Sequence, residues 1–202
     1  MRNQLAAIEL RSLVSELKQL DGAWLDQVYD LPTTAAAAAK SGKALVLQLS
    51  AGEGKRWLVC LAPSAAFMSS RKPATAESLG SFCSLLRHHL GNAKLAVISQ
   101  KGCERIIELV FSSRSKQQLR LVFELFSKGN VILVDDAGVV VGCAESQTWK
   151  DRTVRPGFKY ALPPATADFA NISAEEFTKL VLSSEKDSVV KALAVGLGLS
   201  GT

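Results

Sequence analysis

The stretch QQLRLVFELFSKGNVILVDD, residues 117–136, contains the clearest structural pattern in the chain. Four apolar residues alternate with other residues along its first half, which places them on one face of a β-strand. They are Leu119, Leu121, Phe123 and Leu125. The segment Lys128-Gly129-Asn130 then provides the backbone freedom of a tight reversal before a second apolar run. The stretch therefore predicts an antiparallel β-hairpin.

Similar short apolar runs occupy much of the chain on either side of this hairpin. They cover residues 23–31, 44–50, 56–62, 94–100, 104–112 and 138–145. Only the five residues AGEGK separate the second run from the third, which predicts another hairpin. Several short strands joined by tight turns predict an α+β fold built on an antiparallel β-sandwich-like or barrel-like sheet.

Two stretches show the three- and four-residue spacing of amphipathic helices. The first is residues 10–20, which an Asp-Gly pair ends. The second is residues 73–91, with a glycine at its end. Its apolar stripe is formed by Leu79, Phe82, Leu86 and Leu90. The alanine-rich residues 32–43 predict a surface insertion rather than a helical turn, because helix breakers bracket them.

Composition changes after a proline-rich segment at residues 152–164. Ser173 and Glu176 have the spacing of a capping box that opens a helix. A second helical segment follows and runs into a glycine-rich end. We therefore predict one domain over residues 1–170, followed over residues 171–202 by the truncated start of a helix-hairpin-helix region.

The 202 residues are 48% hydrophobic and 21% charged, a balance typical of an ordered globular protein. The formal charge of +5 is compatible with a nucleic-acid partner but too small to demonstrate one. Glutamates interrupt the apolar residues near the N-terminus, and no apolar run reaches the length of a membrane span. We therefore expect a cytoplasmic protein with no membrane partner.

Patterns that support catalysis or metal binding are absent from the sequence. Four cysteines are scattered without a C-x-x-C pair, so we expect reduced, mostly buried thiols. The adjacent His88 and His89 lack a third metal ligand. The sequence contains no nucleophile elbow, P-loop, zinc-protease motif or dinucleotide fingerprint. We expect no catalytic residues, no metal, no cofactor and no enzymatic activity.

Glu104 and Arg105 stand side by side where one apolar run begins. If residues 104–111 alternate as a strand, Arg105 shares the face of Ile107 and Glu104 points to the opposite face. From the residues alone, a solvated strand end is favoured over contact with a partner, since most charged residues are exposed. Glu9 flanks the apolar stripe of the first helix and is either solvated or lines a groove between helix and sheet.

Two sets of residues are candidates for phosphate binding. Arg87 and His89 lie at the end of the second helix, where they complement the helix dipole or, with Lys101 nearby in sequence, bind phosphate. Gly196 and Gly198 either form a C-terminal turn or present backbone N–H groups to a phosphate at a helix start. Both alternatives stay open for each set.

A series of short motifs resembles, in order, the N-terminal domain of the NFACT family of ribosome-associated quality-control proteins, which includes fibronectin- or fibrinogen-binding protein A-like members. The motifs are a helix ending in Leu-Arg and a glycine, a Gln-x-Gly, an acidic residue followed by Arg, a hairpin from Glu to Asn, and a Pro-Gly-x-x-Tyr-x-x-Pro-Pro exit. Here they fall on Arg87, Gly91, Gln100, Gly102, Glu104, Arg105, Glu124, Asn130, Pro156, Gly157, Tyr160, Pro163 and Pro164. The resemblance covers nearly the whole chain.

The resemblance implies a fold similar to the N-terminal domain of formamidopyrimidine-DNA glycosylases, followed by a helix-hairpin-helix region. It also implies that the full protein binds large ribosomal subunits obstructed by peptidyl-tRNA and recruits aminoacyl-tRNA, so that a C-terminal tail is added to the stalled nascent chain. The tRNA-related positions of the family fall on Glu9, Glu104 and Arg105. The family often has Asp at the two acidic positions, where this sequence has Glu.

With this resemblance, contact with a partner becomes the favoured interpretation of Glu104 and Arg105. A guanidinium suits a phosphate or a base edge, and a carboxylate accepts hydrogen bonds from exocyclic amines or ribose hydroxyls. One alternative is a glycosylase-like DNA-binding protein, although the chain starts Met1-Arg2 where the glycosylases use Pro-Glu. The other is an adhesin that binds fibronectin or fibrinogen, against which we weigh the lack of a signal peptide.

Overall fold

The computed structural model describes residues 4–32, 34, 43–52, 54–113, 117–163 and 171–197. The insertion predicted over residues 32–43 falls almost wholly outside the described residues, and Gly198 falls outside them as well. The helices are α1 (Ala7–Leu17), the 3-10 turn η1 (Lys18–Leu20), α3 (Ser81–Leu90), α4 (Ala174–Leu182) and α5 (Val189–Gly196). The strands are β1 (Trp24–Asp30), β2 (Lys43–Ala51), β3 (Gly54–Ala62), β4 (Ala65–Ser69), β5 (Lys94–Gln100), β6 (Ile106–Ser112), β7 (Gln118–Glu124), β8 (Asn130–Val134), β9 (Val140–Cys143), β10 (Gln147–Thr148) and β11 (Thr153–Val154).

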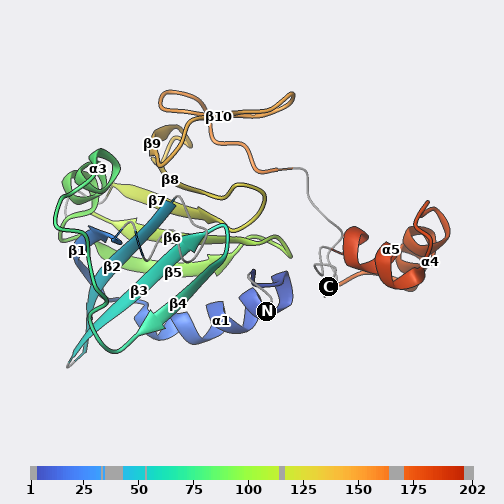
Figure 1. Cartoon of the computed structure of the whole chain (residues 1–202), viewed down its shortest axis with the longest axis horizontal. Coiled ribbons are helices and arrows are strands. Elements are labelled where there is room, and N and C mark those ends of the chain that lie inside the picture. Colours follow the sequence, from blue (N-terminus) through green and yellow to red (C-terminus); the bar gives the residue numbers. More distant parts are fainter. Residues whose placement is uncertain are drawn as a thin grey trace.

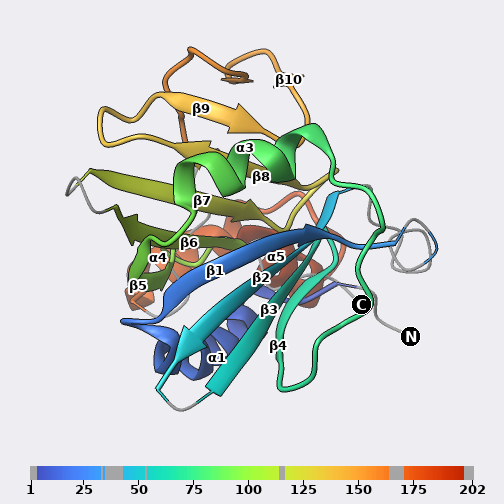
Figure 2. The same cartoon turned by 90° about the vertical axis from the view of Figure 1, so that its left-hand side faces the viewer.

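Within the described part of the chain, nine strands form one antiparallel sheet in the order β4-β3-β2-β1-β5-β6-β7-β8-β9. The sheet bends where β1 meets β5 through Trp24 and Lys94, so its two halves cross in Figures 1 and 2. β3 of one half contacts β7 of the other. The α+β class and the antiparallel sheet are confirmed, and the two layers of the predicted sandwich are halves of one folded sheet.

The hairpin predicted over residues 117–136 is formed by β7 and β8. Leu121 pairs with Leu133 and Phe123 pairs with Val131, and all four side chains are buried in the main core. Gly129 has a φ of +66°, and its N–H donates to the Phe126 carbonyl oxygen at 2.8 Å. Apolar alternation and turn chemistry therefore predict this hairpin correctly.

Helices α1 and α3 cover different ends of the main core. In Figure 1, α1 runs along the bottom of the folded sheet and α3 lies at its upper left, and in Figure 2 α3 lies in front of β7 and β8. From α1, Leu10, Val14 and Leu17 are buried in this core, and from α3, Leu86 and Leu90 are buried there. Each such leucine contributes about 1.5–3 kcal/mol through burial, so both helices are held mainly by their apolar stripes.

The second predicted helix begins later than expected. α3 starts at Ser81 instead of residue 73, so Leu79 precedes the helix and is exposed. The Gly80 N–H donates to Asp30 Oδ2 at 2.7 Å, and this bond from β1 fixes the start of the helix. Strand β4 was not predicted either. It pairs with β3 and forms one edge of the sheet, with Phe67 exposed.

A second, smaller core lies on the other face of β6–β9, beneath the exit segment at residues 149–161. Val154 and Tyr160 from this segment pack there against the strands. Next to them, the Glu124 carboxylate accepts hydrogen bonds from Arg152 and, at 2.8 Å, from the Tyr160 hydroxyl. Burial first, and Glu124 second, raise the pKa of the Tyr160 hydroxyl, which therefore stays protonated as a donor. This polar cluster fastens the exit segment to β7.

The predicted capping box is present at the start of α4. The Glu176 N–H donates to Ser173 Oγ at 3.1 Å, and the Ser173 N–H donates to Glu176 Oε2 at 2.9 Å. These hydrogen bonds lower the pKa of the Glu176 carboxyl. α4 contacts α5, where a Cβ on Gly196 would come within 2.8 Å of the Leu180 side chain. The domain boundary, the helix-hairpin-helix assignment and the glycosylase-like fold stay predictions.

We expect Ser173→Ala to destabilise the first turn of α4 by about 1 kcal/mol, because an N-cap hydroxyl satisfies one otherwise unpaired helix donor. Amide hydrogen exchange should speed up about fivefold at Glu176 and its neighbours. Ser183→Ala, at the C-terminal cap of the same helix, is the matched control and should leave those amides unchanged. Equal protection of Glu176 in the wild type and in Ser173→Ala would contradict the capping role.

The four cysteines, all within the described residues, form no disulfide bond. Cys60, Cys83 and Cys103 are buried, and Cys143 is half-buried. This agrees with the prediction of reduced, mostly buried thiols. In the described part of the chain, no helix has the length and apolar character needed to cross a membrane.

Candidate nucleic-acid interface

Glu104 and Arg105 lie in the turn between β5 and β6, not in a strand. β6 begins at Ile106, so the prediction that Arg105 shares a strand face with Ile107 is wrong. Gly102 takes a φ of +52°, and the Glu104 N–H donates to the Lys101 carbonyl oxygen at 2.9 Å. These features close the turn before the strand starts, and both charged residues are half-buried within it.

Arg105 reaches from this turn to the segment that precedes α1. Its guanidinium Nη1 donates to Gln4 Oε1 at 2.9 Å and approaches the Leu5 carbonyl oxygen at 3.4 Å. Its own carbonyl oxygen accepts the Leu125 N–H at 2.8 Å. Arg105 is therefore anchored at both ends, by its side chain to the start of α1 and by its backbone to the end of β7.

Glu9 lies in the first turn of α1, on the same end of the helix that Arg105 reaches. Its Oε2 accepts the Ala6 N–H at 2.6 Å, and the residue is exposed to solvent. A carboxylate at this position also interacts favourably with the positive end of the helix dipole. Glu9 thus helps to form the N-terminus of α1 and presents negative charge there.

Gln100 joins the turn to the helix. Its side-chain Nε2 donates to the Ala7 carbonyl oxygen of α1 and to the Glu104 carbonyl oxygen of the turn, both at 2.9 Å. We call Glu9, Gln100, Glu104 and Arg105 the turn–helix cluster. The structure therefore brings the three residues predicted for tRNA binding to one place. Gln100 belongs to the Gln-x-Gly motif but was not predicted as a site residue.

Lys101 lies in the same turn but is engaged in a local ion pair. Its ammonium lies 2.7 Å from Glu108 Oε2, and Arg120 lies 3.1 Å from Glu108 Oε1. Glu108 is only 4% exposed. Because a buried carboxylate needs these partners, the position of Lys101 favours a structural role over the predicted phosphate contact.

Arg87 and His89 lie on α3, which covers a different end of the main core from α1 (Figure 2). The Arg87 Nε donates to the Val28 carbonyl oxygen at 2.7 Å, and its guanidinium lies 5.2 Å from the centre of the Tyr29 ring. Burial and the neighbouring His88 lower the pKa of the His89 imidazole, which reduces its positive charge. The structure therefore does not bring Arg87 and His89 to the turn–helix cluster.

Gly196 is the last residue of α5, so its N–H lies within a helix and not at a helix start. Gly196 lies so close to the Leu180 side chain that a Cβ would clash with it, which explains why a glycine is present here. This placement favours the alternative of a C-terminal turn over phosphate binding. Gly198, the second glycine predicted for phosphate binding, is outside the described residues.

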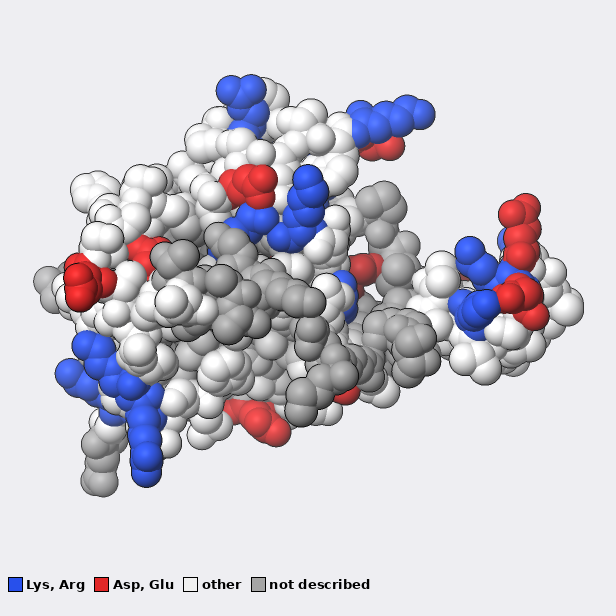
Figure 3. All heavy atoms as spheres, in the orientation of Figure 1, with Lys and Arg blue, Asp and Glu red and all other residues white. Residues whose placement is uncertain are grey.

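Positive charge is not concentrated in one patch on the face drawn in Figure 3. Among the described residues, lysines and arginines gather at the lower left and near the top, and acidic side chains are interspersed elsewhere. On this face the basic side chains of the described residues are therefore spread over several places. Recognition of an anionic partner would depend on local geometry such as that of the turn–helix cluster.

Comparison with known proteins shows similarity over nearly all of the chain. Residues 7–202 match the NFACT N-terminal and middle domains. The archaeal Rqc2 homolog aRqcH of Methanocaldococcus jannaschii is 25% identical over 213 residues, which cover 100% of this chain and 30% of the relative. The human ribosome quality control complex subunit NEMF is 24% identical over 194 residues, covering 95% of this chain and 17% of the relative. The chain thus spans at most about a third of the length of these relatives.

Solved structures show the same fold at low sequence identity. The N-terminal domain of the fibronectin-binding protein PavA from Streptococcus pneumoniae superimposes with a TM-score of 0.75 at 21% identity, covering 96% of this chain and 77% of that one. The fibrinogen-binding protein from Staphylococcus aureus gives 0.73 at 20% identity, covering 93% and 67%. The fold agrees with the match over residues 7–202, and this chain belongs to the NFACT family.

Proposed function

We propose that this chain is the N-terminal RNA-binding part of a ribosome-associated quality-control factor and that its turn–helix cluster contacts tRNA. The observation that carries the proposal is the convergence of three contacts near the start of α1. Arg105 approaches the Leu5 carbonyl oxygen, Glu9 accepts the N–H of the next residue, Ala6, and Gln100 holds the Glu104 carbonyl oxygen. A tRNA offers phosphates and base edges to a guanidinium, and ribose hydroxyls and exocyclic amines to carboxylates. Membership of the NFACT family, with relatives named as ribosome quality control subunits, supports the proposal.

The wider role concerns the protein of which this chain forms a part. We infer that this protein binds large ribosomal subunits obstructed by peptidyl-tRNA and promotes C-terminal tailing of stalled nascent chains in the cytoplasm. This chain covers 30% or less of the named relatives, so other parts share that work. In this proposal the N-terminal part acts by binding alone, without catalysis or a cofactor.

The adhesin alternative rests on the names of the solved neighbours, which concern fibronectin and fibrinogen. At 20–21% identity these neighbours support the fold alone. The glycosylase-like alternative predicts a preference for duplex DNA. Binding of the chain to fibronectin, to duplex DNA and to tRNA, measured at equal salt concentration, distinguishes the two alternatives from the proposal.

We expect Arg105→Ala to weaken tRNA binding about 10- to 100-fold, since a well-placed arginine contact contributes about 1–3 kcal/mol. Arg105→Lys should lose most of this affinity as well, because an ammonium lacks the planar fork of a guanidinium. Glu104→Gln should weaken binding by a smaller factor. Fluorescence anisotropy with labelled bulk tRNA, repeated at several KCl concentrations, measures all of these.

Two controls separate loss of contact from loss of structure. Gln4→Ala removes the Arg105 hydrogen-bond partner without changing charge, and it should bind as the wild type does. Arg155→Ala removes an exposed arginine of the exit segment and should have little effect. The proposal fails if Arg105→Ala binds tRNA like the wild type, or if Arg155→Ala loses as much affinity.

A further inference from the structure

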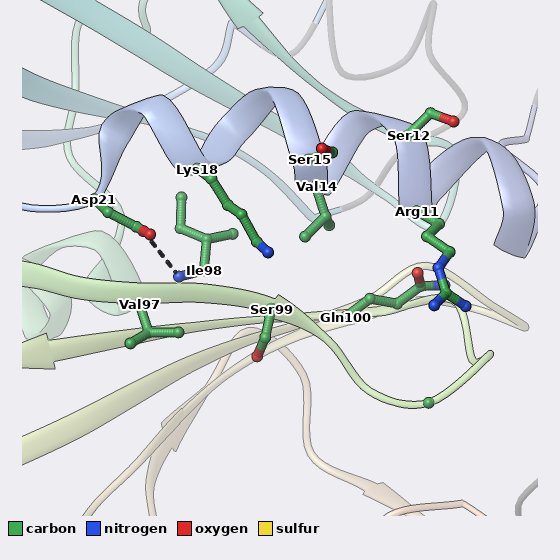
Figure 4. A pocket seen from close by; sticks show the side chains of 11 residues that line it. Arg11, Ser12, Val14, Ser15, Lys18, Asp21, Val97, Ile98, Ser99 and Gln100 are labelled. Atoms are coloured by element: carbon green, nitrogen blue, oxygen red, sulfur yellow. Dashed lines mark hydrogen bonds between the residues drawn. The ribbon is translucent and has the colours of Figure 1, made fainter.

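A groove of about 800 Å³ runs between α1 and β5. The backbone of Gly22 and Ala23, just before β1, still hydrogen-bonds Leu95 of β5, and the groove lies beyond this point along β5. Asp21 lines the groove, and its carboxylate accepts the Ile98 N–H at 3.1 Å (Figure 4). At Ile98, β5 is therefore bonded by the Asp21 side chain and not by a neighbouring strand, and the groove belongs to the fold itself.

One wall of the groove is basic. Arg11, Ser15 and Lys18 follow one another at four- and three-residue spacing, which places them on one face of α1 and η1. In Figure 4 the Arg11 and Lys18 side chains extend from the helix toward β5. Both residues are exposed, and within the described ranges neither forms an ion pair or a side-chain hydrogen bond. Seven residues of helix separate the two cations by about 10 Å along the axis.

The groove leads directly to the turn–helix cluster. Gln100 and Gly102 line the groove, and Gln100 also bonds the Glu104 carbonyl oxygen. The only acidic residue among the lining residues is Asp21, whose carboxylate is engaged by the Ile98 N–H. A ligand that leaves Arg105 along β5 would therefore meet the serine hydroxyls and the two cations of this wall.

The chemistry of the combined surface favours RNA over an acidic peptide. The groove offers cations and hydroxyl donors, which suit phosphate oxygens. The cluster adds the carboxylates of Glu9 and Glu104, which suit the hydroxyl and amine donors of a nucleotide and repel a carboxylate-rich chain. RNA carries phosphate anions and neutral hydroxyl and amine donors on one strand, whereas the side chains of an acidic peptide carry only carboxylates.

We propose that the α1–β5 groove binds the sugar–phosphate backbone of RNA, with Arg11 and Lys18 contacting phosphates that continue from the nucleotide held at the turn–helix cluster. This inference rests on the proposed function and adds a second contact region to it. The groove residues set affinity and the direction of the strand, whereas the cluster contacts the bases or ribose.

The test compares two double variants that remove the same charge. Arg11→Gln/Lys18→Gln changes the groove, and Lys150→Gln/Arg155→Gln changes two exposed cations beside β10 and β11. Binding of labelled bulk tRNA and of a 12-nucleotide oligouridine is measured between 50 and 400 mM KCl, concentrations chosen to span about one decade of salt dependence. For the groove variant, the slope of log K against log[KCl] should become shallower by about 1.4–2, because each lost phosphate contact removes about 0.7–1. The control variant should keep the wild-type slope.

A steric variant tests the location without changing charge. Ser15→Trp places a large side chain in the groove. The control, Ser84→Trp, places an equally large side chain on the exposed side of α3, away from the groove. The first should weaken oligouridine binding at least tenfold and the second should leave it unchanged. Melting temperatures of both variants are recorded, so that loss of binding is assigned only to folded protein.

Each outcome separates this inference from the proposed function. If Arg105→Ala loses affinity while Arg11→Gln/Lys18→Gln keeps the wild-type slope, the groove proposal is wrong and the cluster proposal stands. If both double variants lose the same amount of slope, the effect comes from net charge alone, and the groove proposal is also wrong. If a 12-residue oligoglutamate binds the groove, and the Arg11→Gln/Lys18→Gln variant keeps the wild-type affinity for RNA, the groove binds an acidic partner and the RNA proposal is wrong. If the wild type binds no RNA, both proposals fail.

Discussion

Arg152→Ala should lower the free energy of unfolding by about 3–5 kcal/mol, because it leaves a buried carboxylate without its countercharge. Glu124 is 1% exposed, and Arg152 is 9% exposed. The guanidinium donates to both Glu124 oxygens, and its Nε donates to the Ala161 carbonyl oxygen at 2.6 Å. It also lies 5.2 Å from the centre of the Tyr160 ring. Urea unfolding followed by circular dichroism measures the loss.

Two further variants give this prediction its controls. Glu124→Leu/Arg152→Met removes both charges together and should recover most of the lost stability, since apolar replacement of a whole buried pair is often neutral. Arg155→Ala removes an exposed arginine three residues away and should change stability by less than about 0.5 kcal/mol. A loss below 1 kcal/mol for Arg152→Ala would mean that water reaches Glu124 and that the cluster does not fasten the exit segment.

The polar cluster of Glu124, Arg152 and Tyr160 also lies close to the turn that carries Arg105. Glu124 pairs with Ile106 across β6 and β7, and the next residue, Leu125, holds the Arg105 carbonyl oxygen through its N–H. The buried ion pair is thus one residue removed from the backbone of Arg105. The presence of Glu124 in its motif is explained by the ion pair with Arg152, which holds β7 next to Arg105. This role requires no contact between Glu124 and a ligand.

The strands and the main hairpin could be predicted from the sequence because their signals are local. Leu119, Leu121 and Phe123 alternate along one strand, and a glycine marks the turn that follows it. The error at Glu104 and Arg105 has the same origin. An apolar pattern locates a strand, but it does not show where the chain leaves the turn, which depends here on the positive φ of Gly102.

The partners of the buried charges could not be predicted, because they are distant in sequence. Glu124 and Arg152 are 28 residues apart, and nothing local distinguishes either of them from an exposed charge. Arg11 and Lys18 are different, since their seven-residue spacing on one helix face is visible in the sequence. Only the structure shows that this face looks onto an open stretch of β5, and that Gln100 connects it to Glu104.

Gly129→Ala is expected to cost about 2–5 kcal/mol, for two reasons that act at the same position. The φ of +66° disfavours any residue with a Cβ by about 1–2 kcal/mol. A Cβ there would also lie 2.6 Å from the Pro63 nitrogen and 2.8 Å from the Ala62 carbonyl carbon. Both of these are backbone atoms of the turn between β3 and β4, so a new Cβ would push apart the two halves of the folded sheet.

Gly52→Ala isolates the first reason, the positive φ, because Gly52 has a φ of +56° and nothing lies within 4 Å of an added Cβ. It should cost only the conformational part, about 1–2 kcal/mol. The difference between the two variants, read from urea midpoints with unchanged slopes, then measures how tightly the β7–β8 turn packs against the β3–β4 turn. Equal losses would show that the halves separate easily there. A larger loss at Gly129 would mean that contact between the turns, as well as the apolar core, holds the sheet in its folded form and keeps β7 in place behind Arg105.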